Sequence, residues 1–117
     1  MDGSRVYLGG LSQGGMGVFD MVARYPELFA AAFPMCGAGR ISTAKDFGRE
    51  VSLWIFHGEK DDIVPPRFSR EYFKQVQKLG GDVRYTEYPG VFHACWVNAF
   101  NEPELLSWLF SKTKKTR

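Results

Sequence analysis

The sequence has few cysteines, no long apolar run and no excess of one charge. Its 117 residues include two cysteines, whose positions match neither a CxxC metal pair nor a disulfide scaffold. No stretch approaches the roughly 18 consecutive apolar residues of a membrane span. The first five residues lack the basic and then apolar build of a secretory signal. These absences argue against a disulfide-rich or membrane-spanning class, and the missing signal predicts a cytoplasmic location for the chain as given.

Charge is nearly balanced, with 15 Lys and Arg against 13 Asp and Glu. Four of the basic residues lie in the last six positions, so the rest of the chain is mildly acidic. This distribution argues against a basic nucleic-acid surface. With 44% hydrophobic residues, the composition suits one compact domain over residues 1–112. A basic tail, residues 113–117, is expected to be solvated and frayed.

Apolar runs alternate with helical patterns along the chain. Runs bounded by glycine or proline predict buried strands at 5–8, 29–36, 51–57 and 83–88. Helices are expected at 16–25, at 66–79 and over much of 96–112, with a break near 101–103. The polar segment 40–49 is expected to be irregular. Because strands alternate with helices, the pattern predicts an α/β fold with about four parallel strands and flanking helices.

One motif carries most of the chemical information. Gly10-Leu11-Ser12-Gln13-Gly14 is a G-x-S-x-G pattern between an expected strand and an expected helix. In such a strand–turn–helix elbow, we expect side chains at either glycine position to collide. The turn would raise the Ser12 hydroxyl above the sheet and aim the Gln13 N–H at a developing oxyanion, aided by the positive end of the helix. The motif therefore predicts a nucleophilic serine.

A nucleophilic serine needs a base, and the base needs an orienting acid. Only two histidines are present. His93 follows the fourth strand, on the same sheet edge as Ser12, and is the expected base. His57 ends the third strand ahead of the acidic candidates, which breaks the usual order of serine, acid and histidine. We therefore expect His57 to be a structural, hydrogen-bonded residue.

Three acidic side chains in the loop after the third strand compete for the acid role. These are Glu59, Asp61 and Asp62. Asp61 is preferred, because it lies within the turn, before the apolar pair Ile63-Val64 that should anchor the loop to the core. Glu59 and Asp62 are expected to be ordinary solvated charges.

Further side chains flank these candidates. Met16 beside the elbow, and Phe92 and Trp96 beside the base, are either core packing or the wall of a substrate pocket. Cys36 ends the second strand and Cys95 follows His93, so both are expected near the same edge. We expect free thiols there, with a single disulfide as the alternative that this proximity leaves open.

Three motifs, in this order, resemble the α/β-hydrolase superfamily: Gly10-Leu11-Ser12-Gln13-Gly14-Gly15, His57-Gly58-x-x-Asp61-x-x-Val64-Pro65 and Gly90-Val91-Phe92-His93-x-x-Trp96. Within it, the sequence is most similar to the group of feruloyl esterases, polyhydroxybutyrate depolymerases and predicted peptidases. The resemblance implies Ser12 as nucleophile, Asp61 as acid and His93 as base. It also implies hydrolysis of small-molecule carboxylic esters through an acyl-enzyme, without metal or organic cofactor. A peptidase of the same fold is the alternative, and members of the group are often exported.

The resemblance begins just before the nucleophile strand, so it implies only the C-terminal half of such a hydrolase. The group's earlier strands are absent, and so is the loop that supplies its second oxyanion N–H, which leaves Gln13 as the single donor. Loss of one donor costs on the order of 100- to 1000-fold in rate. A second hypothesis is therefore a weakly active or inactive fragment that acts in assembly or binding. Arg5 to Gly9 would form a bare apolar edge, which predicts a homodimer through this strand.

Overall fold

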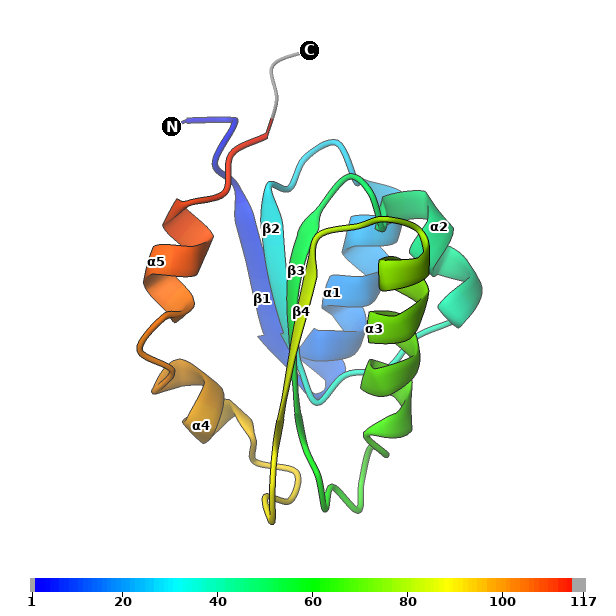
Figure 1. Ribbon diagram of the computed structural model, residues 1–117, viewed down its shortest axis with the longest axis vertical. Coiled ribbons are helices and arrows are strands. Elements are labelled where there is room, and N and C mark those ends of the chain that lie inside the picture. The colour runs from blue at the N-terminus through cyan, green and yellow to red at the C-terminus, as the bar shows by residue number, and fades with distance from the viewer. Residues whose placement is uncertain (1, 115–117) are drawn as a thin grey trace.

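The computed structural model describes residues 2–114, and its centre is a parallel sheet of four strands in the order β1-β2-β3-β4. The strands are β1 (Tyr7–Leu11), β2 (Ala31–Met35), β3 (Ser52–Gly58) and β4 (Val83–Tyr88). The helices are α1 (Gln13–Arg24), the 3-10 turn η1 (Ile41–Thr43), α2 (Ala44–Phe47), α3 (Arg67–Lys78), α4 (Trp96–Phe100) and α5 (Leu105–Phe110). Helices α1 to α3 cover one face of the sheet, and α4 and α5 cover the other (Figure 1). The expected α/β fold with about four parallel strands and flanking helices is confirmed.

Strand β3 is the buried centre of the molecule, because it supplies side chains to the apolar layers on both faces. Leu53 and Ile55 point into the layer under α1, α2 and α3, where the rings of Phe19 and Tyr72 stack at 4.0 Å. All four of these side chains are buried. Burial on both faces explains why β3 is a continuous apolar run rather than an alternating one.

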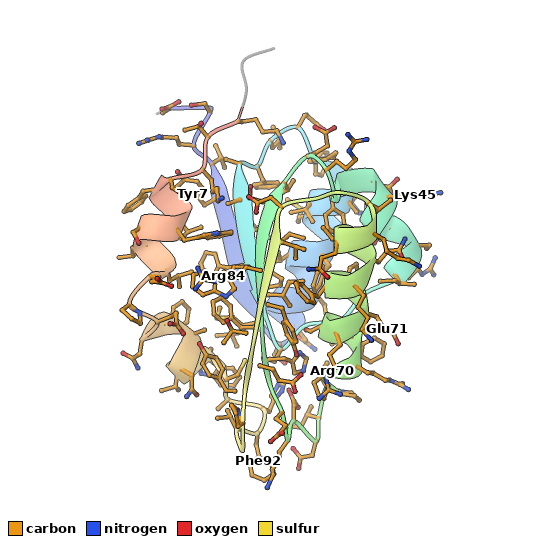
Figure 2. The ribbon with its side chains drawn as sticks, in the orientation of Figure 1. Tyr7, Lys45, Arg70, Glu71, Arg84 and Phe92 are labelled. Carbon is orange, nitrogen blue, oxygen red and sulfur yellow. The ribbon has the colours of Figure 1, made fainter. Side chains whose placement is uncertain are left out.

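The opposite layer lies between the sheet and α4 and α5. Trp54 and Phe56 of β3 stack there at 4.9 Å, and Trp108 of α5 meets Trp54 edge-on. Arg84 of β4 lies across the Trp54 ring at 3.8 Å and pairs with Glu104 at 2.6 Å, beside α5 (Figure 2). This layer attaches the last third of the chain to the sheet.

Strand β1 differs from the expected strand at 5–8, since it runs through the two glycines that were expected to end it. Gly9 pairs with Phe33 of β2, whose ring occupies the space above it. A Cβ at Gly9 would lie only 2.2 Å from that ring. Glycine is therefore needed here for close packing within the strand, not for a turn.

Two other expectations are corrected. Helix α1 begins at Gln13 rather than near Met16, and it includes glycines that propensity alone would place outside a helix. Segment 40–49 is not irregular but contains η1 and α2. Ala44 and Phe47, one turn apart in α2, are both buried, but two positions are too few to produce a helical period. The expected break near 101–103 is confirmed by the gap between α4 and α5.

Strand β1 lies at one edge of the sheet, and within residues 2–114 it pairs only with β2. The Val6 carbonyl accepts from Ala30 N–H at 2.9 Å, and Ser12 N–H donates to the Met35 carbonyl at 2.9 Å. Main-chain groups alternate in direction along a strand. The N–H and C=O groups of the intervening residues Tyr7, Gly9 and Leu11 therefore face the open edge.

The described part of the basic tail is anchored, not frayed. Lys114 N–H donates to the Ser4 carbonyl at 2.6 Å, and its ammonium group donates to the carbonyls of Pro26, Phe29 and Glu50. The remainder of the tail, residues 115–117, lies outside the described residues. Among the described residues, no helix has the length and apolar character needed to cross a membrane.

Candidate active site

Ser12 occupies a strained turn between β1 and α1. Its φ is 55°, in the left-handed region that residues other than glycine rarely adopt. The turn explains Gly10, where a Cβ would lie 2.4 Å from the Gly14 carbonyl oxygen. The expected collision at Gly14 is wrong, because a Cβ there meets no atom of the described chain within 4 Å. The crowding falls instead on Gly15, where a Cβ would lie 2.7 Å from the Met35 carbonyl oxygen.

The elbow rests on the end of β2. Besides its bond to the Met35 carbonyl, the Ser12 N–H lies 3.3 Å from the Cys36 Sγ, which accepts from it. Cys36 itself has a φ of 44°, so two residues in direct contact both adopt left-handed backbone. Gln13 is the first residue of α1, a position at which a helix offers no acceptor for the backbone N–H. That N–H is therefore available to an anion, and its role as oxyanion donor stays a prediction.

The structure brings together the three residues that were predicted from the sequence, which lie in three separate loops. The Ser12 Oγ lies 2.9 Å from His93 Nε2, and His93 Nδ1 lies 2.8 Å from Asp61 Oδ2. A carboxylate only accepts hydrogen bonds, so Nδ1 carries the ring proton and donates it to Asp61. Nε2 then has a free lone pair, which accepts from the Ser12 hydroxyl. This tautomer is the one in which a histidine can remove a proton from a serine.

The loops after β3 and β4 are joined along their length, which fixes the distance between Asp61 and His93. Glu59 N–H donates to the Tyr88 carbonyl at 3.0 Å, and Lys60 N–H donates to the Val91 carbonyl at 2.9 Å. Gly58 allows the close approach, since a Cβ there would lie 2.1 Å from the Phe92 carbonyl oxygen. Gly58 is therefore required, because a side chain at this position would clash with the loop that carries His93.

One of the two rejected acids has a structural role. The Glu59 side chain accepts from Gly90 N–H at 2.9 Å and so adds a further link between the two loops. The expectation that Glu59 is only a solvated charge is therefore corrected. Asp62 is exposed, as expected.

Asp61 contacts both histidines, and its side chain has no exposed surface. Oδ1 accepts from the backbone N–H groups of Ile63 and Val64, each at 2.9 Å, while Oδ2 faces His93. Burial disfavours the charged form, but the hydrogen bonds from His93, Val64 and Ile63 outweigh it and lower the pKa of Asp61 below its usual value. The carboxylate therefore stays ionised and can stabilise a positive charge on His93.

His57 is fully buried and hydrogen-bonded, which confirms the structural reading of this residue. Its Nε2 lies 2.7 Å from the Val64 carbonyl and 3.2 Å from Asp61 Oδ2, and its Nδ1 lies 2.7 Å from Ser69 Oγ. Since a carbonyl can only accept, Nε2 carries the proton and Nδ1 accepts from the Ser69 hydroxyl. Burial lowers the pKa of His57, although Val64 and Asp61 oppose this, so the ring is neutral.

The three pocket candidates lie in different surroundings. Met16 lines a cavity of about 450 Å³ beside the elbow. Trp96 meets the His93 ring edge-on at 5.6 Å, so it packs on the base. Phe92 is 56% exposed at the tip of the loop after β4 (Figure 2). The role of each in substrate binding stays a prediction.

Sequence reasoning missed the other walls of the Met16 cavity. Residues from α1, from the segment before and within η1, and from the start of α3 contribute to it: Phe19, Asp20, Ala38, Gly39, Arg40, Thr43, Phe68 and Tyr72. No motif marks them, because they meet only after α3 has packed beside α1. The cavity is mainly apolar, with Asp20 and Arg40 as its charged members.

One cluster within the described residues has the composition of a metal site. Ligand atoms of Cys36, Asp61 and His93 all lie within 4.8 Å of one another. Asp61 and His93 are already hydrogen-bonded to each other, so an ion here would have to displace the ring proton of His93. The cluster is therefore better described as part of the serine, histidine and aspartate relay, and the absence of a metal cofactor stays a prediction.

Comparisons with known proteins identify the family of the chain. The model of the phospholipase/carboxylesterase family matches residues 1–103. Feruloyl esterase B of Neurospora crassa is 32% identical, over 68% of this chain and 39% of that protein. Acyl-protein thioesterase 1 of Emericella nidulans is 31% identical, over 78% and 41%. The chain spans between a quarter and somewhat under half of the length of such curated relatives.

Solved structures place the fold in the same family. A thermostable esterase superposes with a TM-score of 0.93 at 38% identity, over 97% of this chain and 32% of that one. Acylaminoacyl peptidase of Pyrococcus horikoshii superposes with a TM-score of 0.83 over 99% of this chain and 25% of that one, but at 16% identity it shows the fold alone. The four-stranded sheet thus corresponds to a fraction of a larger hydrolase sheet. The chain belongs to the phospholipase/carboxylesterase family of α/β-hydrolases.

Proposed function

We propose that this chain hydrolyses carboxylic esters of small molecules with Ser12 as nucleophile, His93 as general base and Asp61 as the acid that orients His93. The observation that carries the proposal is the continuous relay, with 2.9 Å between Ser12 Oγ and His93 Nε2 and 2.8 Å between His93 Nδ1 and Asp61 Oδ2. A structural serine has no need of a strained backbone and an ionised carboxylate behind its partner. Both are features of an activated nucleophile.

The steps follow from the tautomer. Ser12 Oγ attacks the ester carbonyl while Nε2 of His93 takes its proton, and the Asp61 carboxylate stabilises the imidazolium. The Gln13 N–H, at the positive end of α1, binds the oxyanion. His93 then returns the proton to the leaving alcohol, which gives an acyl-enzyme on Ser12. A water molecule repeats the cycle, with its proton passing through His93, and the carboxylic acid leaves.

Esters are favoured over amides because the curated relatives are named as feruloyl esterase, acyl-protein thioesterase and monoacylglycerol lipase. An alcohol or thiol leaves more readily than an amine, so the acyl-enzyme forms more readily from an ester or thioester than from an amide. A peptidase of the same fold is the alternative within this mechanism. A weakly active or inactive chain that acts in assembly or binding is the alternative outside it.

A fluorophosphonate probe tests the nucleophile independently of the natural substrate. We expect the folded chain to be labelled on one serine, and Ser12→Ala to abolish labelling. Ser107→Ala is the matched control, because Ser107 is an exposed serine on α5 whose hydroxyl bonds only within its own helix. Absence of labelling in a folded sample of the native sequence would favour assembly or binding over catalysis.

A substrate panel then separates the alternatives. The panel contains an aryl ester, an acyl thioester, a monoacylglycerol and the matching anilide, each with several acyl lengths. Turnover of the esters and not of the anilide supports the proposal, whereas comparable turnover of the anilide would assign a peptidase.

We also propose that two copies pair through β1. The support is the open edge at Tyr7, Gly9 and Leu11, since a bare edge strand readily pairs with another copy. Sedimentation of the native chain should give a dimer at micromolar concentration, and Leu11→Lys should shift it to monomer. Ile63→Lys, which introduces the same charge at an exposed position 68% open to solvent in the loop after β3, should leave the dimer intact. A monomeric native chain would exclude this pairing.

A further inference from the structure

Two cysteines that the reaction does not use lie directly beneath the candidate nucleophile. Cys36 follows β2 and Cys95 precedes α4, so they come from opposite ends of the chain. Both are free thiols with no exposed surface, in the apolar layer under α4 and α5. Both belong to the same cluster of buried side chains, and each thiol is the largest influence on the pKa of the other. The fold has thus paired the only two thiols of the sequence.

The two cysteines contact both the candidate nucleophile, Ser12, and the candidate base, His93. Cys36 Sγ accepts the Ser12 N–H at 3.3 Å and lies within 4.8 Å of ligand atoms of Asp61 and His93. Cys95 N–H donates to the His93 carbonyl at 2.8 Å, so the second cysteine is fixed to the backbone of the base. A covalent bond between the two sulfurs would therefore act on the position of Ser12 and of His93, whereas removal of the Cys95 side chain alone leaves its N–H bonded to the base.

The two thiols are not equivalent. The hydrogen bond from the Cys95 thiol lowers the pKa of Cys36; burial opposes this, and the Ser12 N–H adds to the lowering. The same contact, together with burial, raises the pKa of Cys95. Cys36 is thus the thiol that more readily forms a thiolate, and Cys95 is its proton donor. Nucleophilic attack on an oxidant requires the thiolate.

We propose that Cys36 and Cys95 form a peroxide-sensitive dithiol whose oxidation to a disulfide reversibly switches off Ser12. The Cys36 thiolate attacks one oxygen of hydrogen peroxide, the O–O bond breaks, and hydroxide leaves and is protonated to water. The Cys95 sulfur then attacks the Cys36 sulfenic acid, the S–O bond breaks, and the second water leaves with the Cys95 proton. Two thiols lose two electrons in total, and one peroxide is reduced to two waters.

Both cysteines are buried, so a small oxidant reaches them through local opening of the fold beside Ser12 and His93, which are partly exposed. Formation of the covalent bond draws the end of β2 toward the start of α4. It also converts the Cys36 sulfur, which accepts the Ser12 N–H, from a thiol into one half of a disulfide. Displacement of a catalytic group by about 1 Å costs on the order of 100-fold in rate. Oxidation should therefore lower activity while the fold is retained.

The loss of activity rests on the proposed function, so the test has two separate readouts. The native chain is treated with hydrogen peroxide, quenched, and divided for mass spectrometry and for fluorophosphonate labelling. We expect a loss of two hydrogens in mass, a peptide that links Cys36 to Cys95, and at least a tenfold fall in labelling rate. Dithiothreitol should restore both. Because the chain has two cysteines, a monomer with this mass change contains only this bridge.

Cys95→Ala is the matched variant, with Cys95→Ser as the conservative one. Each should keep labelling within a few-fold of the native chain under reducing conditions and should lose the inactivation that dithiothreitol reverses. Dithiothreitol does not reverse oxidation of the four methionines, which all three proteins share. Any loss of labelling that methionine oxidation causes is therefore equal in the three proteins and can be subtracted.

Two results would overturn the dithiol. One is a folded native chain whose thiols both survive peroxide but react after unfolding. The other is a Cys36–Cys95 bridge that forms with unchanged labelling, which would remove the switch and leave only a structural bridge. If the reduced chain is not labelled at all, the proposed function fails, and the bridge is decided by mass alone.

Discussion

The two histidines lie on opposite sides of one carboxylate oxygen, yet their surroundings differ in every respect that matters for chemistry. Asp61 Oδ2 lies 2.8 Å from His93 Nδ1 and 3.2 Å from His57 Nε2. The His57 side chain has no exposed surface, whereas the His93 side chain is 16% exposed. Both ring nitrogens of His57 bond to buried groups, the Val64 carbonyl and the Ser69 hydroxyl, while Nε2 of His93 meets the hydroxyl of the partly exposed Ser12.

The difference shows that contact with an aspartate is not enough to make a histidine a general base. Burial disfavours the charged form of His57, and a base must become charged when it accepts a proton. His93 retains access to solvent and to a substrate, and the ionised Asp61 can stabilise its charge. The interior histidine therefore holds the acid loop in place, and the outer histidine is left to move protons.

The largest effect is expected from His93→Ala. Without the base, Ser12 is an ordinary alcohol, so fluorophosphonate labelling and ester turnover should fall by at least about 10⁴-fold, to background. The midpoint of urea unfolding should change less than in a variant of His57, because the His93 side chain keeps some exposure to solvent and that of His57 has none. Rates are compared at equal concentrations of folded protein. Full ester turnover in this variant would mean that the base is another residue.

His57→Ala should instead act on stability. The substitution leaves Ser69 Oγ and the Val64 carbonyl without partners and opens a cavity in a fully buried position. We expect it to lower the free energy of unfolding by about 3 kcal/mol in urea denaturation. Ser69→Ala removes only one of these bonds and should cost about 1 kcal/mol. A near-neutral His57→Ala with abolished turnover would reverse the roles assigned to the two histidines.

The order of the motifs along the sequence selected Ser12 and His93, since parallel strands bring their carboxyl ends to one edge. Asp61 was preferred to Glu59 and Asp62 for its place in the turn before Ile63-Val64. The assignment of His57 followed from its place before the acids. What the sequence did not reveal depends on packing between distant segments. Glu59 bonds to Gly90 across two loops, and the crowding at Gly15 comes from β2, 20 residues further on.

The walls of the Met16 cavity were missed for the same reason. Arg40 and Tyr72 lie in segments that carry no motif, and they meet because η1 packs against α3, where the Tyr72 hydroxyl donates to the Arg40 carbonyl. The short helix α2 was missed because its two buried residues are too few to show a period. The predicted boundaries of β1 were wrong because its glycines were interpreted as turn residues, whereas Gly9 makes room for the Phe33 ring.

The smallest effect that still separates the two histidines is the response of stability to acid. Burial lowers the pKa of His57 below 6.5, although Asp61 and Glu87 oppose it. Below pH 6.5 the unfolded chain therefore binds a proton at this position that the folded chain refuses. Stability is full above pH 6.5 and falls as the pH drops toward the folded pKa of His57, by at most about 1.4 kcal/mol per pH unit.

Protonation of Asp61 lowers stability only at a more acidic pH. The pKa of Asp61 is lowered from 3.8, so its contribution to stability disappears only as the pH falls below that value. Urea unfolding at several pH values between 7.5 and 5 therefore isolates the histidine. His57→Gln cannot titrate, so its slope over this range should be shallower than that of the native chain. His93→Ala, in which His57 remains, should keep the part of the slope that His57 causes. Equal slopes in the native chain and His57→Gln would mean that His57 accepts a proton in the folded state as easily as in the unfolded one, and the contrast between a neutral interior histidine and an outer histidine that acts as the base would no longer hold.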